Sequence, residues 1–221
     1  LQERNHRLHV GELFFMQENE RILQVAGHLV GIGNEIGRLI ATVKLHALND
    51  VKLGLKTFGF FDRDQIGEAA KLWRKNGFER LKMTVGMNAL KRRDDERRPL
   101  LEAIREDRIR VRNVREAVGE GAELFVDANC SLDQYHAIML ANWIEEYDIA
   151  FFEEPITHNN VCQMAEMRTR TKVPVAAGQT ETLAYRFRDF ITERAVDVLQ
   201  PNVIIGGGYT QIQKVAGMAH A

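Results

Sequence analysis

The chain has 221 residues, of which 45% are hydrophobic and 28% are charged, and its formal net charge at pH 7 is −1. This composition is typical of a globular protein, and the near balance of charge gives no reason to expect nucleic acid or an anionic membrane as a partner. No apolar run approaches the roughly 20 residues of a membrane span, and the N-terminus does not resemble a signal peptide. Because the two cysteines, Cys130 and Cys162, form no motif, we expect a cytoplasmic protein in a reducing compartment.

From about residue 56 onward the sequence repeats one pattern, in which a short apolar segment is followed by a loop and then by a helical pattern. The six apolar segments lie at 56–61, 78–86, 122–129, 149–155, 172–178 and 196–208. Strands that alternate with helices predict an α/β fold with a parallel sheet covered by helices. The segments are almost continuously apolar, as parallel strands buried on both faces should be.

Glycine-rich segments give little support to a dinucleotide-binding fold. The sequence GIGNEIG at 31–37 resembles the phosphate-binding fingerprint only loosely, and it follows no convincing strand. The run Gly206–Gly208 is expected to form a tight loop or the entrance of a helix. As an alternative, its backbone amides could contact a substrate anion.

Polar side chains stand at the carboxyl end of nearly every predicted strand, and the last four recur at intervals of 26, 26 and 23 residues. They are Lys82 and Thr84, then Asp127, Glu153, Gln179 and Asn202. In a β/α barrel the carboxyl ends of the strands meet at one rim, and active sites lie there. We therefore expect these side chains to form one ring, whereas the alternative is that each is a separate helix-capping or loop residue.

Three of these side chains, Asp127, Glu153 and Gln179, offer two carboxylates and an amide oxygen from neighbouring strands. Mg²⁺ prefers hard oxygen ligands of this kind, with water and substrate oxygens completing an octahedron. Without a cation the two carboxylates would repel each other in a partly dry site. The pattern therefore predicts Mg²⁺ as the cofactor.

Five segments in chain order, FERLKMTVG, VDANCSLD, FFEEP, AAGQTE and VLQPNVIIGGG, resemble the barrel of the enolase superfamily, in its mandelate racemase/muconate lactonizing enzyme branch. The resemblance implies an α+β capping domain followed by a modified (β/α)₇β barrel, which is a variant of the (β/α)₈ TIM barrel. It also implies Mg²⁺-dependent abstraction of the proton α to a substrate carboxylate, with the metal stabilising the resulting enediolate.

The resemblance also divides the chain. We expect residues 1–55 to be a partial capping domain, with a strand at GELFF, and residues 56–221 to hold the first six strand–helix units of the barrel. A full barrel of this family needs two further units beyond residue 221. We therefore expect the 221 residues to be ordered pieces of a longer chain, and the alternative is a truncated and rearranged protein.

The resemblance assigns roles to the polar strand ends. Asp127 and Glu153 fall on the first two metal-ligand positions, and Gln179 falls on the third, which is usually glutamate. Because a glutamine carbonyl coordinates Mg²⁺ without adding negative charge, weaker metal binding is expected.

The catalytic positions depart further from the family pattern. Lys82 falls on the lysine that helps to neutralise the substrate carboxylate, whereas Thr84 replaces the lysine that is normally the base. Asn202 falls where an aspartate usually pairs with a histidine, so that base would be weakened. Three residues beyond the strand ends are candidates for substrate binding, although a solvated loop is the alternative for the histidine: Asn129, Glu154 and His158.

The leading functional hypothesis is a Mg²⁺-dependent lyase that dehydrates a small-molecule carboxylate, namely a sugar acid of the aldonate or aldarate type. It rests on the metal ligands, on Lys82 and on the absence of paired lysines. A non-catalytic or repurposed binding protein on the same scaffold is the alternative, because Thr84, Gln179 and Asn202 each remove charge that the family's chemistry uses. A racemase or epimerase needs bases on both faces of the substrate, and this chain offers fewer. Family members commonly assemble as homo-oligomers, and the same is expected here.

Overall fold

The structure, a computed structural model, describes residues 13–17, 21–25, 55–58 and 61–221, with side chains from residue 61 onward. Near the N-terminus, β1 (Leu13–Gln17) and β2 (Arg21–Val25) form an antiparallel pair. The strand β1 includes the last three residues of GELFF, where a strand was expected, and its place in a capping domain stays a prediction. The rest of the predicted capping-domain segment, residues 1–12, 18–20 and 26–54, lies outside the described residues.

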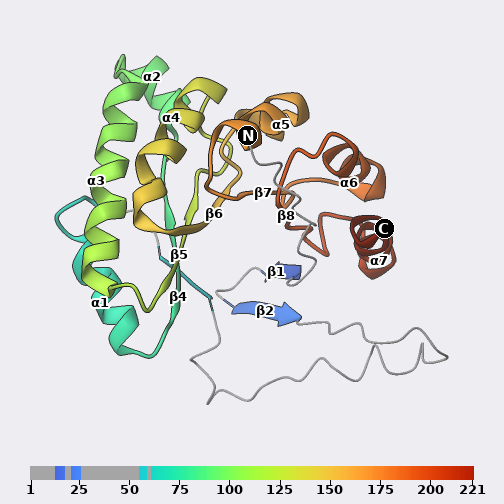
Figure 1. The fold of residues 1–221 in the computed structure, drawn as a ribbon, viewed down its shortest axis with the longest axis horizontal. Coiled ribbons are helices and arrows are strands. Elements are labelled where there is room, and N and C mark those ends of the chain that lie inside the picture. Colours follow the sequence, from blue (N-terminus) through green and yellow to red (C-terminus); the bar gives the residue numbers. More distant parts are fainter. Residues whose placement is uncertain (1–12, 18–20, 26–54, 59–60) are drawn as a thin grey trace.

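The larger sheet has six strands, and every neighbouring pair in it is parallel (Figure 1). Its strands, in spatial as in chain order, are β3 (Leu55–Phe58), β4 (Arg80–Thr84), β5 (Glu123–Asp127), β6 (Ile149–Glu153), β7 (Val175–Ala177) and β8 (Val198–Leu199). This order confirms the predicted parallel sheet. Strands that follow one another in space as in the chain, with helices between them, are arranged as in a β/α barrel.

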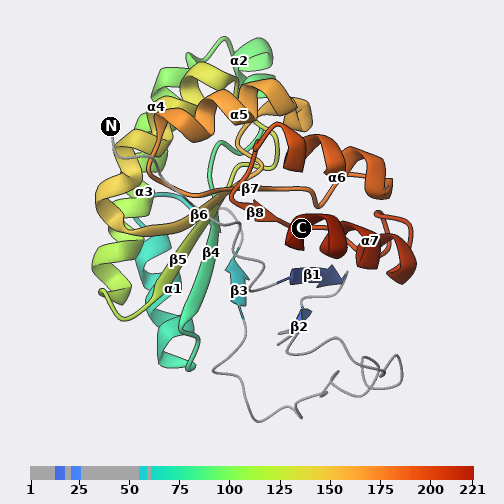
Figure 2. The same ribbon diagram turned by 45° about the vertical axis from the view of Figure 1, so that its right-hand side comes forward.

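Helices connect and cover the strands, as Figures 1 and 2 show. They are α1 (Ile66–Lys75), α2 (Ala89–Glu96), α3 (Leu100–Val118), α4 (Gln134–Ile144), α5 (Val161–Arg170), α6 (Leu183–Thr192) and α7 (Tyr209–His220), with 3₁₀ turns at Glu145–Tyr147 and Thr157–Asn159. Gly208 precedes the first residue of α7, which confirms the predicted helix entrance at the glycine run. Within the described residues, none of these helices has the length and apolar character needed to cross a membrane.

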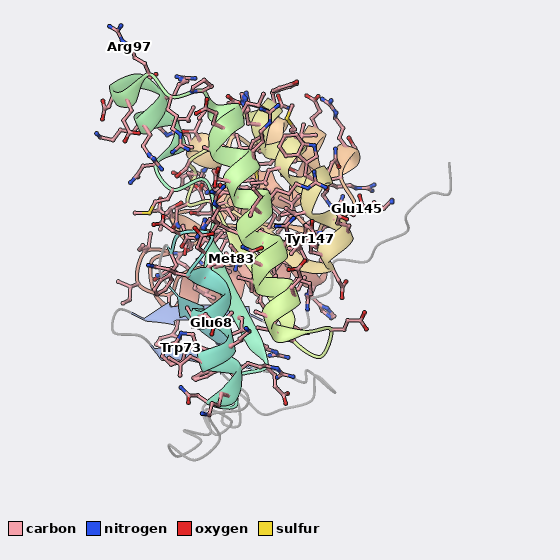
Figure 3. The ribbon with its side chains drawn as sticks, turned by 90° about the vertical axis from the view of Figure 1, so that its left-hand side faces the viewer. Glu68, Trp73, Met83, Arg97, Glu145 and Tyr147 are labelled. Carbon is pink, nitrogen blue, oxygen red and sulfur yellow. The ribbon has the colours of Figure 1, made fainter. Side chains whose placement is uncertain are left out.

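The main hydrophobic core lies between the helices and the sheet. Figure 3 shows α1 and α3 side by side over this face, with Met83 of β4 in the layer that they cover. Leu124 and Val126 of β5 and Phe152 of β6 belong to the same core, and all three are fully buried. Burial of these side chains supplies the main favourable free energy that holds the helices on the sheet.

A smaller apolar cluster lies on the other face of the sheet, and it determines where the polar strand ends are placed. It is formed by Phe125, Phe151 and Ala176, and the two phenylalanine rings have their centroids 4.5 Å apart. Because side chains alternate between the faces of a strand, Asp127 and Glu153 follow Phe125 and Phe151 on this inner face. The alternation therefore delivers both carboxylates to the same end of the sheet interior.

Candidate active site

The ends of β4, β5 and β6 bring one lysine and two carboxylates into contact. The Lys82 Nζ atom lies 2.7 Å from Glu153 Oε2 and 3.1 Å from Asp127 Oδ2. The strand register places Asp127 directly beside Glu153. The exposed fractions of the three side chains are 2% for Lys82, 7% for Asp127 and 0% for Glu153. The structure thus brings together the three residues in a compact buried cluster of two carboxyl groups and one ammonium group.

Burial and charge have opposing effects on the pKa values in this cluster. Burial and the charge of Asp127 raise the pKa of Glu153 to about 7, although the Lys82 ammonium and, more weakly, the Gln200 side chain act in the opposite direction. Burial would lower the pKa of Lys82, but Glu153 and Asp127 together hold it above its ordinary value. Lys82 is therefore charged at neutral pH, and a positive charge is held between the two carboxylates.

The two carboxylate oxygens that Lys82 does not contact, Asp127 Oδ1 and Glu153 Oε1, indicate whether a metal ion fits this cluster. Asp127 Oδ1 accepts a hydrogen bond from the backbone N–H of Asn129 at 2.9 Å. Glu153 Oε1 is buried and has no hydrogen-bond partner among the residues that the structure describes. A buried carboxylate oxygen without a partner is costly, and a hard cation would satisfy it. The two carboxylates therefore fit Mg²⁺ as oxygen ligands.

Further ligands for such an ion would be amide, water or substrate oxygens. Within the described ranges, no group of three or more His, Cys, Asp or Glu side chains is arranged to hold a metal ion. A site built on Asp127 and Glu153 alone has less negative charge than one with three carboxylates, and the weaker metal binding expected from this stays a prediction.

Gln179, predicted as the third ligand, faces a different carboxylate. Its Nε2 atom donates a hydrogen bond to Glu154 Oε2 at 2.9 Å. Asn159 Nδ2 and Thr180 Oγ1 donate to the other oxygen of Glu154, each at 3.0 Å. Glu154 is only 1% exposed, so these three donors replace the water that its carboxylate loses. Coordination of a metal by Gln179 Oε1 stays a prediction, and the amide nitrogen of Gln179 is committed to Glu154.

The loops after β5 and β6 hold an unusual concentration of left-handed backbone conformations. Positive φ angles occur at Asn129 (46°), Cys130 (57°), Glu154 (41°), His158 (56°) and Asn159 (45°). Non-glycine residues rarely adopt this conformation, and where they do they cluster at functional sites. The backbone N–H of Cys130 donates to the Glu154 carbonyl oxygen at 2.7 Å, which fastens one loop to the other.

The other predicted site residues have varied surroundings. Thr84 lies beside Asp127 in the strand register and is half-buried. His158 is exposed, in agreement with the solvated alternative. Asn202 is half-buried, and its Oδ1 accepts hydrogen bonds from the backbone N–H groups of the two residues that follow Val203, at 2.9 and 3.2 Å. The side-chain amide oxygen of Asn202 thus stabilises the turn that follows this residue.

A buried ion pair on α3, which sequence reasoning missed, supports the end of β4. Arg110 Nη1 donates to Asp107 Oδ1 at 2.7 Å and to the Thr84 carbonyl oxygen at 2.9 Å. Its Nε donates to the Phe61 carbonyl oxygen at 2.7 Å. Asp107 Oδ2 accepts from the backbone N–H of Gly86, also at 2.7 Å. The Asp107–Arg110 pair therefore holds the backbone at the end of β4 through the Thr84 carbonyl oxygen and the Gly86 N–H group.

Signals for some of the missed residues were present in the sequence. Asp107 and Arg110 fall three or four residues from Ile104 and Val114 on the buried face of α3, so helical periodicity places both in the apolar stripe. Asn159, which donates to Glu154, is of a residue type that favours left-handed turns. No comparable signal marks Gln200, which is buried beside Glu153.

Among proteins of known function, two relatives are enzymes that act on sugar acids or their lactones. Arabinonate dehydratase of Saccharolobus solfataricus is 28% identical over 158 residues, which cover 72% of this chain and 39% of the relative. D-galactarolactone cycloisomerase of Agrobacterium fabrum is 31% identical over 168 residues, which cover 73% of this chain and 40% of the relative. The chain spans about two fifths of the length of these relatives.

Solved structures show the same similarity. The 3,6-anhydro-D-galactonate cycloisomerase of Zobellia galactanivorans matches with a TM-score of 0.65 and 28% identity, over 75% of this chain and 42% of its own. L-talarate dehydratase of a Polaromonas species, complexed with Mg and L-glucarate, matches with a TM-score of 0.62 and 27% identity, over 75% of this chain and 44% of its own. A mandelate racemase/muconate lactonizing enzyme of a marine actinobacterium, in complex with magnesium, has a TM-score of 0.62, 28% identity and coverage of 75% and 43%.

The match to a family is the most extensive of these findings. Residues 65–221 fit the model of the family described as enolase C-terminal domain-like. They begin just before α1 and contain five of the six parallel strands and the whole charged cluster of Lys82, Asp127 and Glu153. Sheet, cluster and family match agree, and the chain belongs to the enolase C-terminal domain-like family, with mandelate racemase/muconate lactonizing enzymes among its structural neighbours.

Proposed function

We propose that the chain is part of a Mg²⁺-dependent dehydratase that acts on sugar acids of the aldonate or aldarate type. The observation that carries the proposal is the buried contact of Lys82 with Asp127 and Glu153 at the ends of three adjacent strands. Support comes from relatives that include an arabinonate dehydratase and a D-galactonate dehydratase. A further neighbour, L-talarate dehydratase, was solved with Mg and L-glucarate.

In this proposal Asp127 and Glu153 hold the metal ion, which fits the partnerless Oε1 of Glu153. When bound, the cation supplies Lewis-acid stabilisation of the negative charge that develops on the substrate carboxylate. Lys82 supplies a positive charge for the same carboxylate, because its pKa is held above the ordinary value. The low exposure of all three side chains strengthens these electrostatic effects relative to water.

The reaction removes one molecule of water from the sugar acid. A base takes the proton from the carbon α to the carboxylate, and hydroxide leaves the neighbouring β carbon. The resulting enol tautomerises to a 2-keto-3-deoxy acid. Because the Thr84 hydroxyl is too weak a base for this proton, the proposal assigns the base to a histidine outside residues 61–221.

A cycloisomerase of a sugar-acid lactone is the second candidate. The 31% identity to D-galactarolactone cycloisomerase and the fold similarity to 3,6-anhydro-D-galactonate cycloisomerase favour it. Dehydration and cycloisomerisation yield different products from different substrates. Product analysis therefore separates the two candidates.

The test is turnover by the full chain across a panel of aldonates, aldarates and aldarolactones, with and without Mg²⁺. We expect Mg²⁺-dependent formation of a 2-keto-3-deoxy acid from at least one sugar acid. Lys82→Ala and Glu153→Gln should each lower kcat/KM by about 100-fold or more, the cost of removing one group that stabilises transition-state charge. Lys172→Ala is the matched control, since Lys172 lies on the surface and pairs with Glu145.

Three outcomes would contradict the proposal. Turnover that survives both substitutions would place the chemistry elsewhere in the protein. Formation of an isomer from a lactone, with no dehydration, would favour the cycloisomerase. Metal binding without turnover of any substrate would favour a non-catalytic binding protein. That alternative is supported by Thr84 in place of a lysine and by the hydrogen bond from Gln179 to Glu154.

A further inference from the structure

The Lys82 ammonium contacts one oxygen of each of the two carboxylates that would hold the metal ion. We propose that Lys82 is a built-in competitor of the divalent cation, so that the two cations exclude each other from the space between the carboxylates. Entry of the metal then releases the ammonium for contact with a substrate carboxylate. This inference rests on the proposed function, because it concerns how the same site changes between its ligands.

The first argument for competition is the short distance between the Lys82 ammonium and both carboxylates. The ammonium contacts one oxygen of each carboxylate, at 2.7 Å from Glu153 and 3.1 Å from Asp127. Mg²⁺ binds its ligand oxygens at about 2.0–2.1 Å and requires a nearly octahedral arrangement. A divalent cation held by these same two oxygens would take the space that the ammonium occupies, so one of the two cations would have to leave it. Repulsion between a divalent cation and an ammonium is also strong at such a short distance in a buried site.

The second argument concerns the charges of Asp127 and Glu153, which hold the Lys82 ammonium away from a substrate carboxylate. Two carboxylates surround the ammonium of Lys82 and compete with any third carboxylate that approaches it. A substrate carboxylate therefore gains little from Lys82 until Asp127 and Glu153 are occupied by another cation. The long, flexible stem of lysine permits the required movement of the ammonium. It follows that metal binds before substrate.

The opposite arrangement predicts the opposite change in metal affinity when the Lys82 ammonium is removed. If Lys82 stayed in place as a permanent bridge, it would hold the two carboxylates together for a metal on their other oxygens, Asp127 Oδ1 and Glu153 Oε1. Removal of the ammonium would then let the carboxylates repel each other, and metal affinity would fall. If Lys82 competes, the same removal raises metal affinity.

The first experiment is calorimetric titration of Mg²⁺ and Mn²⁺ into the full chain and into its Lys82→Met variant. Methionine keeps most of the apolar stem and removes the charge. We expect Mg²⁺ to bind the variant about tenfold more tightly or better, the lower end of the effects that residues around a metal site have on affinity. Lys91→Met is the control, because Lys91 forms an exposed ion pair with Asp95 on α2, and its affinity should equal that of the parent chain. Equal or weaker binding by Lys82→Met overturns the proposal, as does absence of binding to both proteins.

A second experiment needs no variant. The parent chain is labelled with an amine-reactive acetylating reagent, with Mg²⁺ or with a chelator, and modification of each lysine is measured by mass spectrometry. Lys82 should react slowly with the chelator present, because it is buried and paired on two sides, and several-fold faster with Mg²⁺. Labelling of Lys91 should not change. If Mg²⁺ leaves the labelling of Lys82 unchanged or lowers it, the ammonium is not released and the proposal fails.

Both readouts are independent of turnover, so the two proposals can fail separately. Tighter Mg²⁺ binding by Lys82→Met, together with no turnover of any sugar acid by the parent chain, would support the competition and contradict the dehydratase. Turnover by the parent chain, together with weaker Mg²⁺ binding by the variant, would do the reverse.

Discussion

Glu153 and Glu154 are neighbours in the sequence, but they belong to different polar clusters. Glu153 ends β6 on the inner face of the sheet and pairs with Lys82. Glu154 is one residue further on, where the strand alternation reverses its direction and the backbone has a φ of 41°. It is saturated by hydrogen bonds from three side chains. These contacts hold Glu154 within the β6 loop, and its predicted role in substrate binding, like that of Glu153 in cation binding, stays a prediction.

A substitution at Gln179 tests this division of roles. Gln179→Glu removes the donor to Glu154 and places a second carboxylate beside a buried one. We expect it to lower the free energy of unfolding by about 1–3 kcal/mol, the cost of leaving a buried polar group without its partner, measured by urea denaturation without metal. Gln213→Glu on α7, where Gln213 is exposed, is the control and should change little. A Gln179→Glu variant as stable as the parent chain would show that Gln179 does not hold Glu154.

Position at a strand end and strand alternation indicated from the sequence that Lys82, Asp127 and Glu153 lie at one end of the sheet, and the structure brings them together there. That Lys82 pairs with both carboxylates was not predicted. The sequence did not predict the partner of Gln179 either, because that side chain follows Gly178, where the strand has ended and φ is 127°. A Cβ atom at Gly178 would lie 2.7 Å from Phe187 Cε1, so only glycine allows this turn. The direction of the next side chain depends on that local backbone rather than on any periodic pattern.

At the scale of elements, α3 does more than cover the sheet. Arg110 crosses from α3 to the backbone carbonyl oxygens of Phe61 and Thr84, which lie beyond β3 and at the end of β4. Burial raises the pKa of Asp107, although Arg110 opposes the shift, and burial lowers the pKa of Arg110. Both charges are therefore held in an unfavourable environment, which is sustained by the hydrogen bonds they make to the backbone.

Arg110→Met should destabilise the protein by about 3–5 kcal/mol, because it leaves Asp107 buried without its partner and releases the end of β4. Arg112→Met is the matched control on the same helix, since Arg112 is exposed and its ion pair with Glu116 spans 3.7 Å. We expect the control to change stability by no more than about 0.5 kcal/mol. Urea denaturation of both variants measures the difference, and equal effects would show that Arg110 does not fasten the strand end.

Some helices and strands were easier to predict from the sequence than others. The strands of the larger sheet were predicted because apolar runs between glycines and prolines have few other interpretations. The helix α2 was not predicted, because its residues are mostly charged and show no apolar periodicity. It is supported instead by ion pairs one turn apart, such as that between Arg92 and Glu96, and pairs of this kind add only a few tenths of a kcal/mol each.

At the scale of the whole molecule, strand order converts spacing in the sequence into proximity in space. Because β4, β5 and β6 are neighbours in the same order as in the chain, a separation of one repeating unit puts their carboxyl ends side by side, whatever the length of the unit. That relation was available from the sequence once the repeating units were recognised. The positions of the Gln179 and Asn202 side chains were not, because local hydrogen bonds decide them: Gln179 donates to Glu154 in the loop after β6, and Asn202 accepts within its own turn.

The central claim is that the ends of β4, β5 and β6 form one cation site through Asp127 and Glu153. Its most direct test is the thermal unfolding of the full chain with and without Mg²⁺, compared with Glu153→Gln and with the exposed control Glu146→Gln. A ligand at 100 times its Kd stabilises the folded state by about 2.7 kcal/mol. We predict that Mg²⁺ raises the Tm of the parent chain and of Glu146→Gln, and that Glu153→Gln loses most of this increase. An equal increase in Tm for all three proteins would contradict the claim.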